Sequence, residues 1–225
     1  MNNKSKKSIA TLFKYRSMSG DSFRHTQDIF LRNRIYLGDH TTLNDPTEGF
    51  YRDESKLVES NNGFYYAEDS PLLSPARAAK ITCFSEDPRI TLMWSHYSNY
   101  HRGICLGFRR KKLEEVSKLY KVKYNQRVPT TPQNATLLEK SIKGFQTKSK
   151  EWEYEKEWRI ISFEESSFIS LPPNSISHVI YGVNTPIEDI EWVQDWIKIT
   201  GITIKRKKVV FSGHAAKMYM SEFDE

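Results

Sequence analysis

The apolar residues of this 225-residue chain are gathered in short segments that are rich in β-branched and aromatic side chains. Such segments, bounded by turn-forming residues, predict strands at residues 11–16, 34–37, 79–85, 103–108, 121–128, 155–163, 176–182, 201–206 and 209–211. Helical periodicity predicts helices at about 20–33, 111–119, 134–147 and 187–200, with a short helix or turn at 90–97. The charged stretch 52–79 is expected to form a helix and a surface loop. Short strands interspersed with short helices predict an α+β fold.

Composition narrows the class of protein further. Apolar residues make up 38% of the chain, below the ~45–50% typical of globular domains, but an aromatic share of 13% argues against disorder. We therefore expect one folded domain over residues 1–225, with a core built largely from rings and a flexible basic N-terminus at 1–10. No stretch approaches the roughly 18–20 apolar residues of a membrane helix, and the N-terminus lacks a signal-peptide core. A cytoplasmic protein without a membrane partner is expected.

Several kinds of site lack their sequence signature. Cys83 and Cys105 have no paired spacing, which is typical of buried free thiols in a reducing compartment. The one close histidine pair, His96 and His101, shares no helix face and has no third ligand nearby, so no metal site is expected. No GxGxxG motif follows a strand and no GxxxxGK[ST] motif is present, which excludes the Rossmann and P-loop signatures.

Residues 152–161 carry a dense alternation of charged and aromatic side chains. On a strand, Glu153, Glu155, Glu157 and Arg159 would share one face. Like charges at alternate positions repel each other unless a cation or a hydroxyl lies opposite them. The row suits a polar cleft in which a carboxylate binds ribose hydroxyls or stabilises a cationic transition state. The alternative is a solvated edge strand with Glu157 and Arg159 paired to neighbours.

A second group combines a hydroxyl at a strand end with aromatic residues and histidine. Ser85 ends the predicted strand 79–85, and Trp94, Ser95, His96 and Tyr97 follow. These side chains suit the positioning and stacking of a flat ring. Two alternatives remain, namely core packing with the histidine at its rim, and a hydrolase that uses Ser85 or Ser95 with His96 but lacks a GxSxG motif.

Two smaller groups are also candidates. Lys14 and Arg16 share a strand face, so two cations could meet a pyrophosphate with Tyr15 packed alongside; the alternative is a solvated basic face. Asn44 belongs to the sequence LNDP, which favours an ordered turn. That turn is either structural or ligand-binding.

The segments LFKYRS, LNDP, CFSE, LMWSHYS with HRGICLGF, and WEYEKEWRII together resemble a widespread bacterial family catalogued only as a domain of unknown function. Their order also resembles the ADP-ribosyltransferase fold, especially DarT-like toxins, which modify nucleic acids and are paired with antitoxins. This resemblance implies split mixed β-sheets with short flanking helices, NAD as substrate and no metal. It implies Glu157 as the catalytic carboxylate, with Glu155 completing an ExE spacing and able to exchange roles with it. The NAD-binding residues that it implies are Lys14, Tyr15, Arg16, Asn44, Ser85, Trp94, His96 and Tyr97.

The net charge of +6 suits a polyanionic partner. The basic runs 109–112 and 205–208 could attract a phosphate backbone, although each could equally be a solvated turn. The DarT-like resemblance implies an NAD-dependent ADP-ribosyltransferase that acts on RNA or single-stranded DNA as a toxin or anti-phage effector, with an antitoxin protein as a further partner, and we expect this function. The alternatives are a non-catalytic nucleic-acid-binding module on the same fold and a protein-directed ADP-ribosyltransferase.

Overall fold

The computed structural model describes residues 9–53, 57–59, 65–67, 78–213 and 217–223. The chain divides into two compact units, each assembled from segments that are distant in the sequence. Unit 1 comprises Met1–Ile35, Phe84–Ser117 and Ser170–Glu225, and unit 2 comprises Tyr36–Cys83 and Lys118–Ile169. The chain passes between the units after Ser117 and within three strands, β2 (Arg34–Tyr36), β7 (Lys80–Ser85) and β14 (Phe168–Ser170). The single domain expected from the length remains a prediction.

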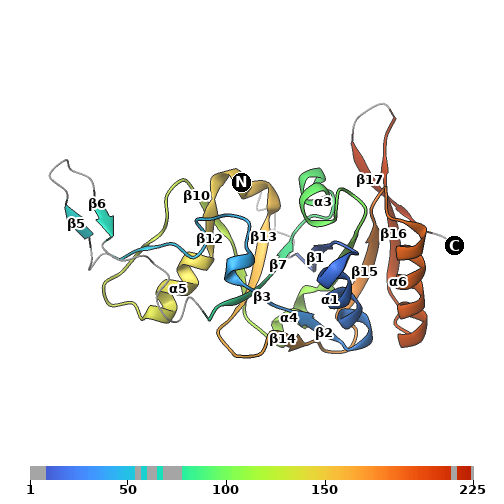
Figure 1. Ribbon diagram of the computed structural model, residues 1–225, viewed down its shortest axis with the longest axis horizontal. Helices are drawn as coiled ribbons and strands as arrows, with labels where there is room; N and C mark the ends of the chain where they lie inside the picture. Colours follow the sequence, from blue (N-terminus) through green and yellow to red (C-terminus); the bar gives the residue numbers. More distant parts are fainter. Residues whose placement is uncertain (1–8, 54–56, 60–64, 68–77, 214–216, 224–225) are drawn as a thin grey trace, which may run out of the picture. The chain divides into compact units, whose positions relative to one another are not determined.

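Unit 1 is built on a mixed sheet with the strand order β17-β16-β15-β8-β1. These strands are β1 (Thr11–Arg16), β8 (Ile104–Arg109), β15 (Ile176–Tyr181), β16 (Lys205–Phe211) and β17 (Met218–Glu222). The central strand β8 pairs antiparallel with β1 and β15, and Ser85 at the end of β7 pairs with Phe13 of β1. Strands β1, β7 and β15 are labelled in Figure 1. Residues 104–108 of β8 are all buried, as expected for an apolar strand with neighbours on both sides and covered faces.

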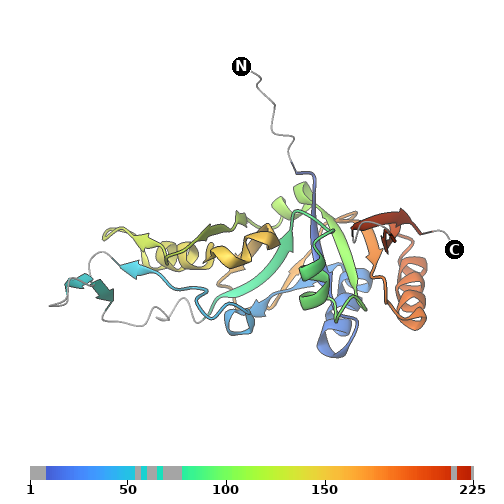
Figure 2. The ribbon, with the colours of Figure 1, turned by 90° about the horizontal axis from the view of Figure 1, so that it is seen from above.

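The helices of unit 1 are α1 (Gly20–Leu31), α3 (Thr91–Tyr97), α4 (Arg110–Glu114) and α6 (Ile187–Thr200). Helices α1 and α6 pack together (Figure 2), and their interface is aromatic. Trp196 of α6 lies with its ring centroid 5.3 Å from that of Phe23 and 5.6 Å from that of Phe30, both on α1. Such ring pairs bury large apolar areas with specific geometry. The expectation of a core built largely from rings is wrong for the described residues as a whole, because aliphatic side chains outnumber rings among their buried hydrophobic residues.

Unit 2 contains short strands around a small apolar core. Lys80 and Ile81 of β7 pair with β3 (Gly38–Asp39), and β13 (Glu157–Ser162) pairs antiparallel with β9 (Leu119–Lys121). Among the described residues, three strand pairs lie wholly in unit 2, namely β10 (Lys123–Asn125) with β12 (Thr147–Ser149), β4 (Arg52–Asp53) with β11 (Thr130–Thr131), and β5 (Leu57–Glu59) with β6 (Tyr65–Ala67). Helix α5 (Leu137–Phe145) begins with a capping box between Thr136 and Glu139, which satisfies backbone N–H groups at its start. Phe145 packs in the core with Ala79, Ile81 and Ile161.

The expected α+β class is confirmed, with several sheets and few helices. The expected helix in 52–79 is wrong for the described residues, which form β4, β5 and β6, and the rest of that stretch lies outside them. The strands expected at 201–206 and 209–211 are the single strand β16. Residues 1–8 of the expected flexible terminus also lie outside the described residues. None of the described helices has the length and apolar character that crossing a bilayer requires.

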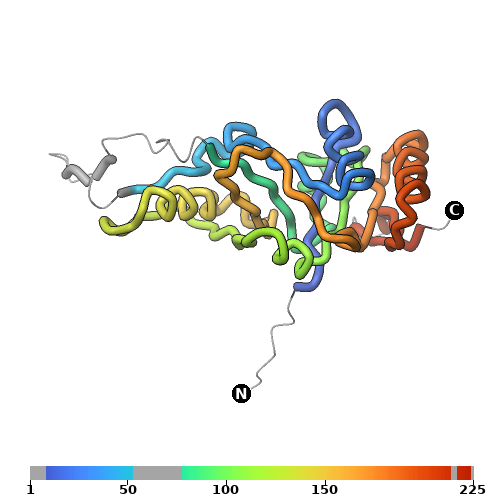
Figure 3. Tube along the Cα trace, turned by 90° about the horizontal axis from the view of Figure 1, so that it is seen from below, coloured from blue at the N-terminus to red at the C-terminus, as the bar shows by residue number. Residues whose placement is uncertain are grey.

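The strand expected at 155–163 begins two residues later than predicted. After α5 and β12, the chain forms a 3₁₀ helix, Lys150–Glu155, before it enters β13 (Figure 3). Lys156 separates the two elements with a left-handed backbone, φ 50°. Alternation along a strand therefore applies only from Glu157 onward, so the predicted row of Glu153, Glu155 and Glu157 on one strand face is wrong.

Candidate active site

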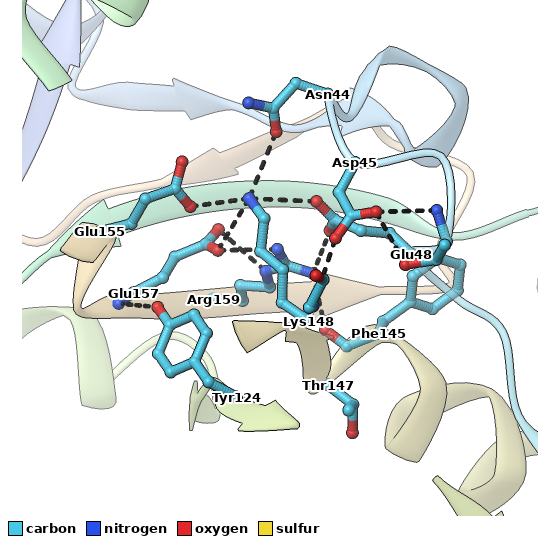
Figure 4. Close-up of polar contacts among 12 residues, drawn as sticks. Asn44, Asp45, Glu48, Tyr124, Phe145, Thr147, Lys148, Glu155, Glu157 and Arg159 are labelled. Atoms are coloured by element: carbon cyan, nitrogen blue, oxygen red, sulfur yellow. Dashed lines mark hydrogen bonds and ion pairs between the residues drawn. The ribbon is translucent and has the colours of Figure 1, made fainter. Parts of the chain in front are cut away.

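Five ionisable side chains of unit 2 form a buried cluster, which we call the ionic cluster: Glu48, Lys148, Glu155, Glu157 and Arg159 (Figure 4). Every one of these side chains is at most 3% exposed. Buried ion pairs seldom stabilise a fold more than apolar residues of similar volume do, because desolvation of the charges is costly. A fully buried cluster is therefore a candidate functional site.

Lys148 of β12 is the centre of the ionic cluster. Its Nζ lies 2.7 Å from Oε2 of Glu155, 3.2 Å from Oε1 of Glu48 and 3.7 Å from Oε2 of Glu157. It also donates a hydrogen bond of 3.2 Å to Oδ1 of Asn44. One ammonium group thus contacts three carboxylates and an amide that come from three separate segments of unit 2.

Arg159 fixes the orientation of Glu157, its neighbour on the same face of β13. The guanidinium donates to both oxygens of Glu157, with Nε–Oε1 at 2.9 Å and Nη2–Oε2 at 2.7 Å. Its Nη1 donates to the carbonyl of Phe145 at 2.8 Å and lies 2.5 Å from Oε2 of Glu48. Bidentate pairs of this kind are strong and geometrically specific. The backbone N–H of Glu157 donates to the hydroxyl of Tyr124 at 2.7 Å.

The LNDP turn brings Glu48 and Asn44 to the ionic cluster. Oδ1 of Asp45 accepts hydrogen bonds from the backbone N–H and the hydroxyl of Thr47, and its Oδ2 accepts from the backbone N–H of Ser149. Asp45 therefore closes the turn on itself, as an Asx turn does, and attaches it to β12 beside Lys148. The turn is both structural and part of the candidate site.

The charges in the ionic cluster shift one another's pKa values. Burial acts to raise the pKa of Glu157, but the charges of Arg159 and Lys148 outweigh it and lower the pKa from 4.5 to about 2. Burial acts to lower the pKa of Lys148, but the facing carboxylates raise it above its ordinary value. Burial raises the pKa of Glu48 despite the nearby Arg159. Glu157, Lys148 and Arg159 are therefore all ionised at neutral pH, and three carboxyl groups share the two cations of the cluster.

A pocket of about 140 Å³ lies beside the ionic cluster and has Lys148 in its wall, together with Thr47, Phe50, Thr147, Ser149 and residues 125–129. It has room for a few waters or one ring, and it is smaller than the pockets that enclose drug-sized ligands. Within the described ranges, no group of three or more His, Cys, Asp or Glu side chains is arranged to hold a metal ion.

The structure brings together three residues that the sequence predicted, namely Asn44, Glu155 and Glu157. Glu153 is not among them, because its side chain is 58% exposed and pairs with Lys150. Of the alternative, the solvated edge strand is wrong, since Glu157 and Arg159 are buried, whereas the expected pairing of these two residues with neighbours is confirmed. The sequence analysis missed Lys148, Glu48 and Tyr124. The only signal for Lys148 was indirect, because repulsion along the acidic row required a cation opposite it.

Lys14 and Arg16, the predicted cation pair of β1, make different contacts in unit 1. Arg16 donates to the carbonyl of Ser22 at 2.7 Å and to the hydroxyl of Thr26 at 3.0 Å, so it holds α1 against β1. Burial lowers the pKa of Arg16 from 12.5 to about 10. The Nζ of Lys14 lies 5.6 Å from the ring centroid of Phe84. The predicted contact of Lys14 and Arg16 with a pyrophosphate stays a prediction.

Tyr15, Ser85 and Trp94 are buried in unit 1 and bond to the loop after β7. The hydroxyl of Tyr15 donates to the carbonyl of Asp87 at 2.8 Å, and the indole N–H of Trp94 donates to the carbonyl of Pro88 at 2.7 Å. Ser85 exchanges hydrogen bonds with the backbone of Asp87. Trp94 has no exposed surface, so its predicted contact with a nicotinamide is corrected to core packing against Tyr15, at 5.2 Å between ring centroids.

His96 and Tyr97 lie at the surface of unit 1, at the end of α3. His96 is exposed and Tyr97 is half-buried. Both line a hollow of about 330 Å³ together with Ser17, Ser95, Asn99 and Tyr100. Their predicted contact with NAD stays a prediction.

The described residues thus form an α+β protein with a buried ionic cluster in one of its two units. A protein-family profile described as "Protein of unknown function (DUF2971)" matches residues 93–160. The matched segment contains Lys148, Glu155, Glu157 and Arg159, and over these residues the expected similarity to an uncharacterised family is confirmed. Neither the curated proteins nor the solved structures contain a match to the chain.

Proposed function

We propose that this protein is an NAD-dependent ADP-ribosyltransferase in which Glu157 stabilises the cationic ribose and Glu155 serves the acceptor. The observation that carries the proposal is that Glu157 is buried yet held ionised by Arg159, with Glu155 on the same Lys148 ammonium. Fixed charges in a buried site stabilise an opposite charge that develops in the transition state. The resemblance of the segment order to DarT-like enzymes, with Glu155 and Glu157 in an ExE spacing, supports the same assignment.

The proposed reaction breaks the bond between the ribose C1′ and the nicotinamide nitrogen. The bonding electron pair leaves with nicotinamide, which departs neutral, and the positive charge remains on the ribose as an oxocarbenium ion. An acceptor hydroxyl or amine then bonds to C1′ and gives its proton to Glu155 as general base. A nucleic acid, either RNA or single-stranded DNA, is the acceptor class that the DarT-like resemblance favours.

Access to the carboxylates is assigned to the pocket beside Lys148. Lys148 lines that pocket and contacts Glu155, Glu157 and Asn44. A ribose hydroxyl entering there meets Lys148, the member of the ionic cluster in the pocket wall, and reaches the carboxylates past it. Arg159 keeps Glu157 in place throughout, because it binds both Glu157 oxygens and the Phe145 carbonyl.

The experiment combines the purified full chain with NAD labelled in its adenylate and, separately, with RNA, single-stranded DNA and a protein fraction. Wild type is expected to release nicotinamide and to label a nucleic acid. Glu157→Gln is expected to lower both rates by about 10²–10⁴-fold. Glu153→Gln is the matched control, because this exposed carboxylate lies four residues away and outside the ionic cluster.

Two further measurements keep the proposal falsifiable. Circular dichroism and urea unfolding of Glu157→Gln establish that the variant is folded, and Glu155→Gln provides an independent variant if it is not. If wild type neither releases nicotinamide nor labels any fraction, the proposed activity is wrong. Labelling of protein alone would replace the nucleic-acid acceptor by a protein one.

A further inference from the structure

A groove of about 920 Å³ lies in unit 1, and its lining residues include none of the ionic cluster, which belongs to unit 2. Its wall includes five cationic side chains, Arg109, Arg110, Lys111, Lys112 and Lys205, and two carboxylates, Glu114 and Glu115. The cations come from both basic runs that the sequence analysis singled out. Each run alone could be a solvated turn, but the fold places residues of both in the wall of one concave surface.

Strand β15 is the reason that the two basic runs meet. It pairs antiparallel with β8 and parallel with β16, so His178 lies opposite both Gly107 and Lys205. Arg109 at the end of β8 and Lys205 at the start of β16 therefore flank the same end of β15. Gly107 permits this packing, because a Cβ at that position would lie 3.1 Å from the His178 ring and from the Thr11 side chain.

The positive charge of the groove is only partly neutralised by its own carboxylates. Arg110 pairs with Glu114 at 2.8 Å, and Lys112 pairs with Glu115 at 3.0 Å. Arg109 instead donates to the backbone carbonyls of Asn174 and Ile176. Those acceptors carry no net charge, so Arg109 keeps its full positive charge at the groove while its position is fixed.

His178 lies in the wall of the groove, and the nearby cations affect its pKa. Its pKa is lowered by burial and then by Lys205, Lys207 and Arg109, and Glu222 acts in the opposite direction. Its ring is oriented by Ser177, whose hydroxyl lies 2.9 Å from Nδ1 and donates to the carbonyl of Gly107. The positive charges of Lys205, Lys207 and Arg109 around this fixed imidazole favour the binding of an anion.

We infer that this groove binds the phosphate backbone of single-stranded RNA, with Arg109, Lys111 and Lys205 as phosphate contacts. The choice of a nucleic acid rests on the proposed function. The volume of the groove matches a ligand of one or two nucleotides, which favours a single strand over a duplex. Carboxylates beside the cations can accept hydrogen bonds from ribose 2′-hydroxyls, which DNA lacks.

The test measures the binding of a short fluorescein-labelled single-stranded RNA by anisotropy, without NAD and over a series of salt concentrations. The variant Lys111→Glu/Lys205→Glu is compared with the control Lys198→Glu/Lys217→Glu, which changes the net charge equally at exposed lysines outside the groove. Removal of two phosphate-binding cations is expected to weaken binding by about tenfold or more. The plot of the logarithm of the association constant against the logarithm of the salt concentration is also expected to become less steep, by about 0.7 for each phosphate that the variant no longer neutralises.

The outcomes separate this inference from the proposed function. Equal weakening by the two variants shows that net charge alone binds RNA and overturns the groove assignment. Equal affinity of wild type for single-stranded DNA, or tighter binding of duplex RNA, overturns the choice of ligand. RNA binding that depends on the groove while NAD is not consumed supports the inference and contradicts the transferase. NAD-dependent labelling of nucleic acid that the groove variant leaves unchanged supports the transferase and contradicts the groove inference.

Discussion

The ammonium group of Lys148 lies 2.7 Å from Oε2 of Glu155 and is only 2% exposed. This ion pair joins β12 to the 3₁₀ helix that precedes β13. The same ammonium reaches Glu48 and Glu157, so it is the shared counter-ion of carboxylates from three segments of unit 2. The relation between Lys148 and Glu155 therefore bears on both the stability of unit 2 and the chemistry proposed for it.

Replacement of Lys148 by methionine is expected to destabilise the protein by about 3–5 kcal/mol, because it leaves buried carboxylates without their counter-ion. Methionine keeps most of the side-chain volume, so packing changes little. Urea unfolding at neutral pH measures the loss in free energy of unfolding. Lys150→Met is the control, since Lys150 is 55% exposed and pairs only weakly with Glu153 at 3.4 Å. Equal effects of the two substitutions would contradict the central role of Lys148.

The pKa of Glu157 predicts a specific pH dependence of stability. Its folded-state pKa of about 2 lies below the ordinary value of 4.5, so the unfolded chain binds more protons between these values. Ionised Glu157 therefore stabilises the fold above pH 4.5, and this contribution is lost as the pH falls from 4.5 through about 2. The pKa of Glu48 is raised in the folded state. Its ionisation therefore lowers the free energy of unfolding as the pH rises above 4.5.

Urea unfolding of wild type and Glu157→Gln over this pH range isolates the contribution of Glu157. The difference in free energy of unfolding is expected to be largest above pH 4.5 and to shrink as the pH falls towards about 2. Glu153→Gln, which removes an exposed carboxylate, is expected to show a small difference throughout. A difference for Glu157→Gln that is independent of pH would mean that Arg159 and Lys148 do not hold this carboxylate ionised.

Glu155 and Glu157 are expected to affect different steps of the proposed reaction. Glu157, fixed by both donors of Arg159, acts on the bond to nicotinamide, so Glu157→Gln loses nicotinamide release and transfer together. Glu155 acts as base for the acceptor, so Glu155→Gln loses transfer by about 10²–10⁴-fold while it still releases nicotinamide to water. Parallel assays of free nicotinamide and labelled acceptor measure the two steps. The reverse pattern would exchange the two roles.

Local sequence patterns were sufficient for many elements of the fold but not for the strand start at Glu157. The helix predicted at 187–200 matches α6, and the strand predicted at 11–16 matches β1, because each has regular periodicity and clear boundaries. Glu155 and Glu157 alternate as a strand would, yet the left-handed backbone of Lys156 interrupts the strand between them. Neither periodicity nor propensity signals a left-handed lysine.

The residues that meet at the two sites could not be paired from the sequence, because they come from segments that only the fold brings together. Lys148 meets Glu155 and Glu157 because β12 pairs with β10 and the chain then turns through a 3₁₀ helix. Arg109 and Lys205 meet because β15 lies between β8 and β16. The individual basic and acidic runs were visible in the sequence, but strand order decided which of them face each other.

Substitution of Lys205 is expected to change the ionisation of His178 even without a ligand. Lys205 is, after burial, the first cause of the lowered His178 pKa, so Lys205→Met is expected to raise that pKa. NMR titration of the His178 imidazole measures the effect. Lys198→Met, an exposed position on α6 outside the groove, is expected to leave the titration unchanged. An unchanged His178 pKa in Lys205→Met would argue against a positive potential at this end of β15.

The turn after α3 predicts a stabilising glycine substitution. Asn99, Tyr100 and His101 have positive φ values of 48°, 55° and 66°, a conformation that costs a residue with a Cβ about 1–2 kcal/mol. The turn is held by the backbone N–H groups of Tyr100 and His101, which donate to the carbonyls of Ser95 and Trp94. Since the Tyr100 side chain is 74% exposed, its removal costs little packing.

Tyr100→Gly is therefore expected to raise the free energy of unfolding by about 0.5–1 kcal/mol, after the greater freedom of glycine in the unfolded chain is subtracted. Leu92→Gly is the matched control, because Leu92 is also partly exposed, at 49%, but lies within α3. Glycine there is expected to lower the free energy of unfolding by about 1 kcal/mol. Urea unfolding of both variants checks the opposite signs. Destabilisation by both would show that Tyr100 contributes contacts that outweigh the strain of its backbone.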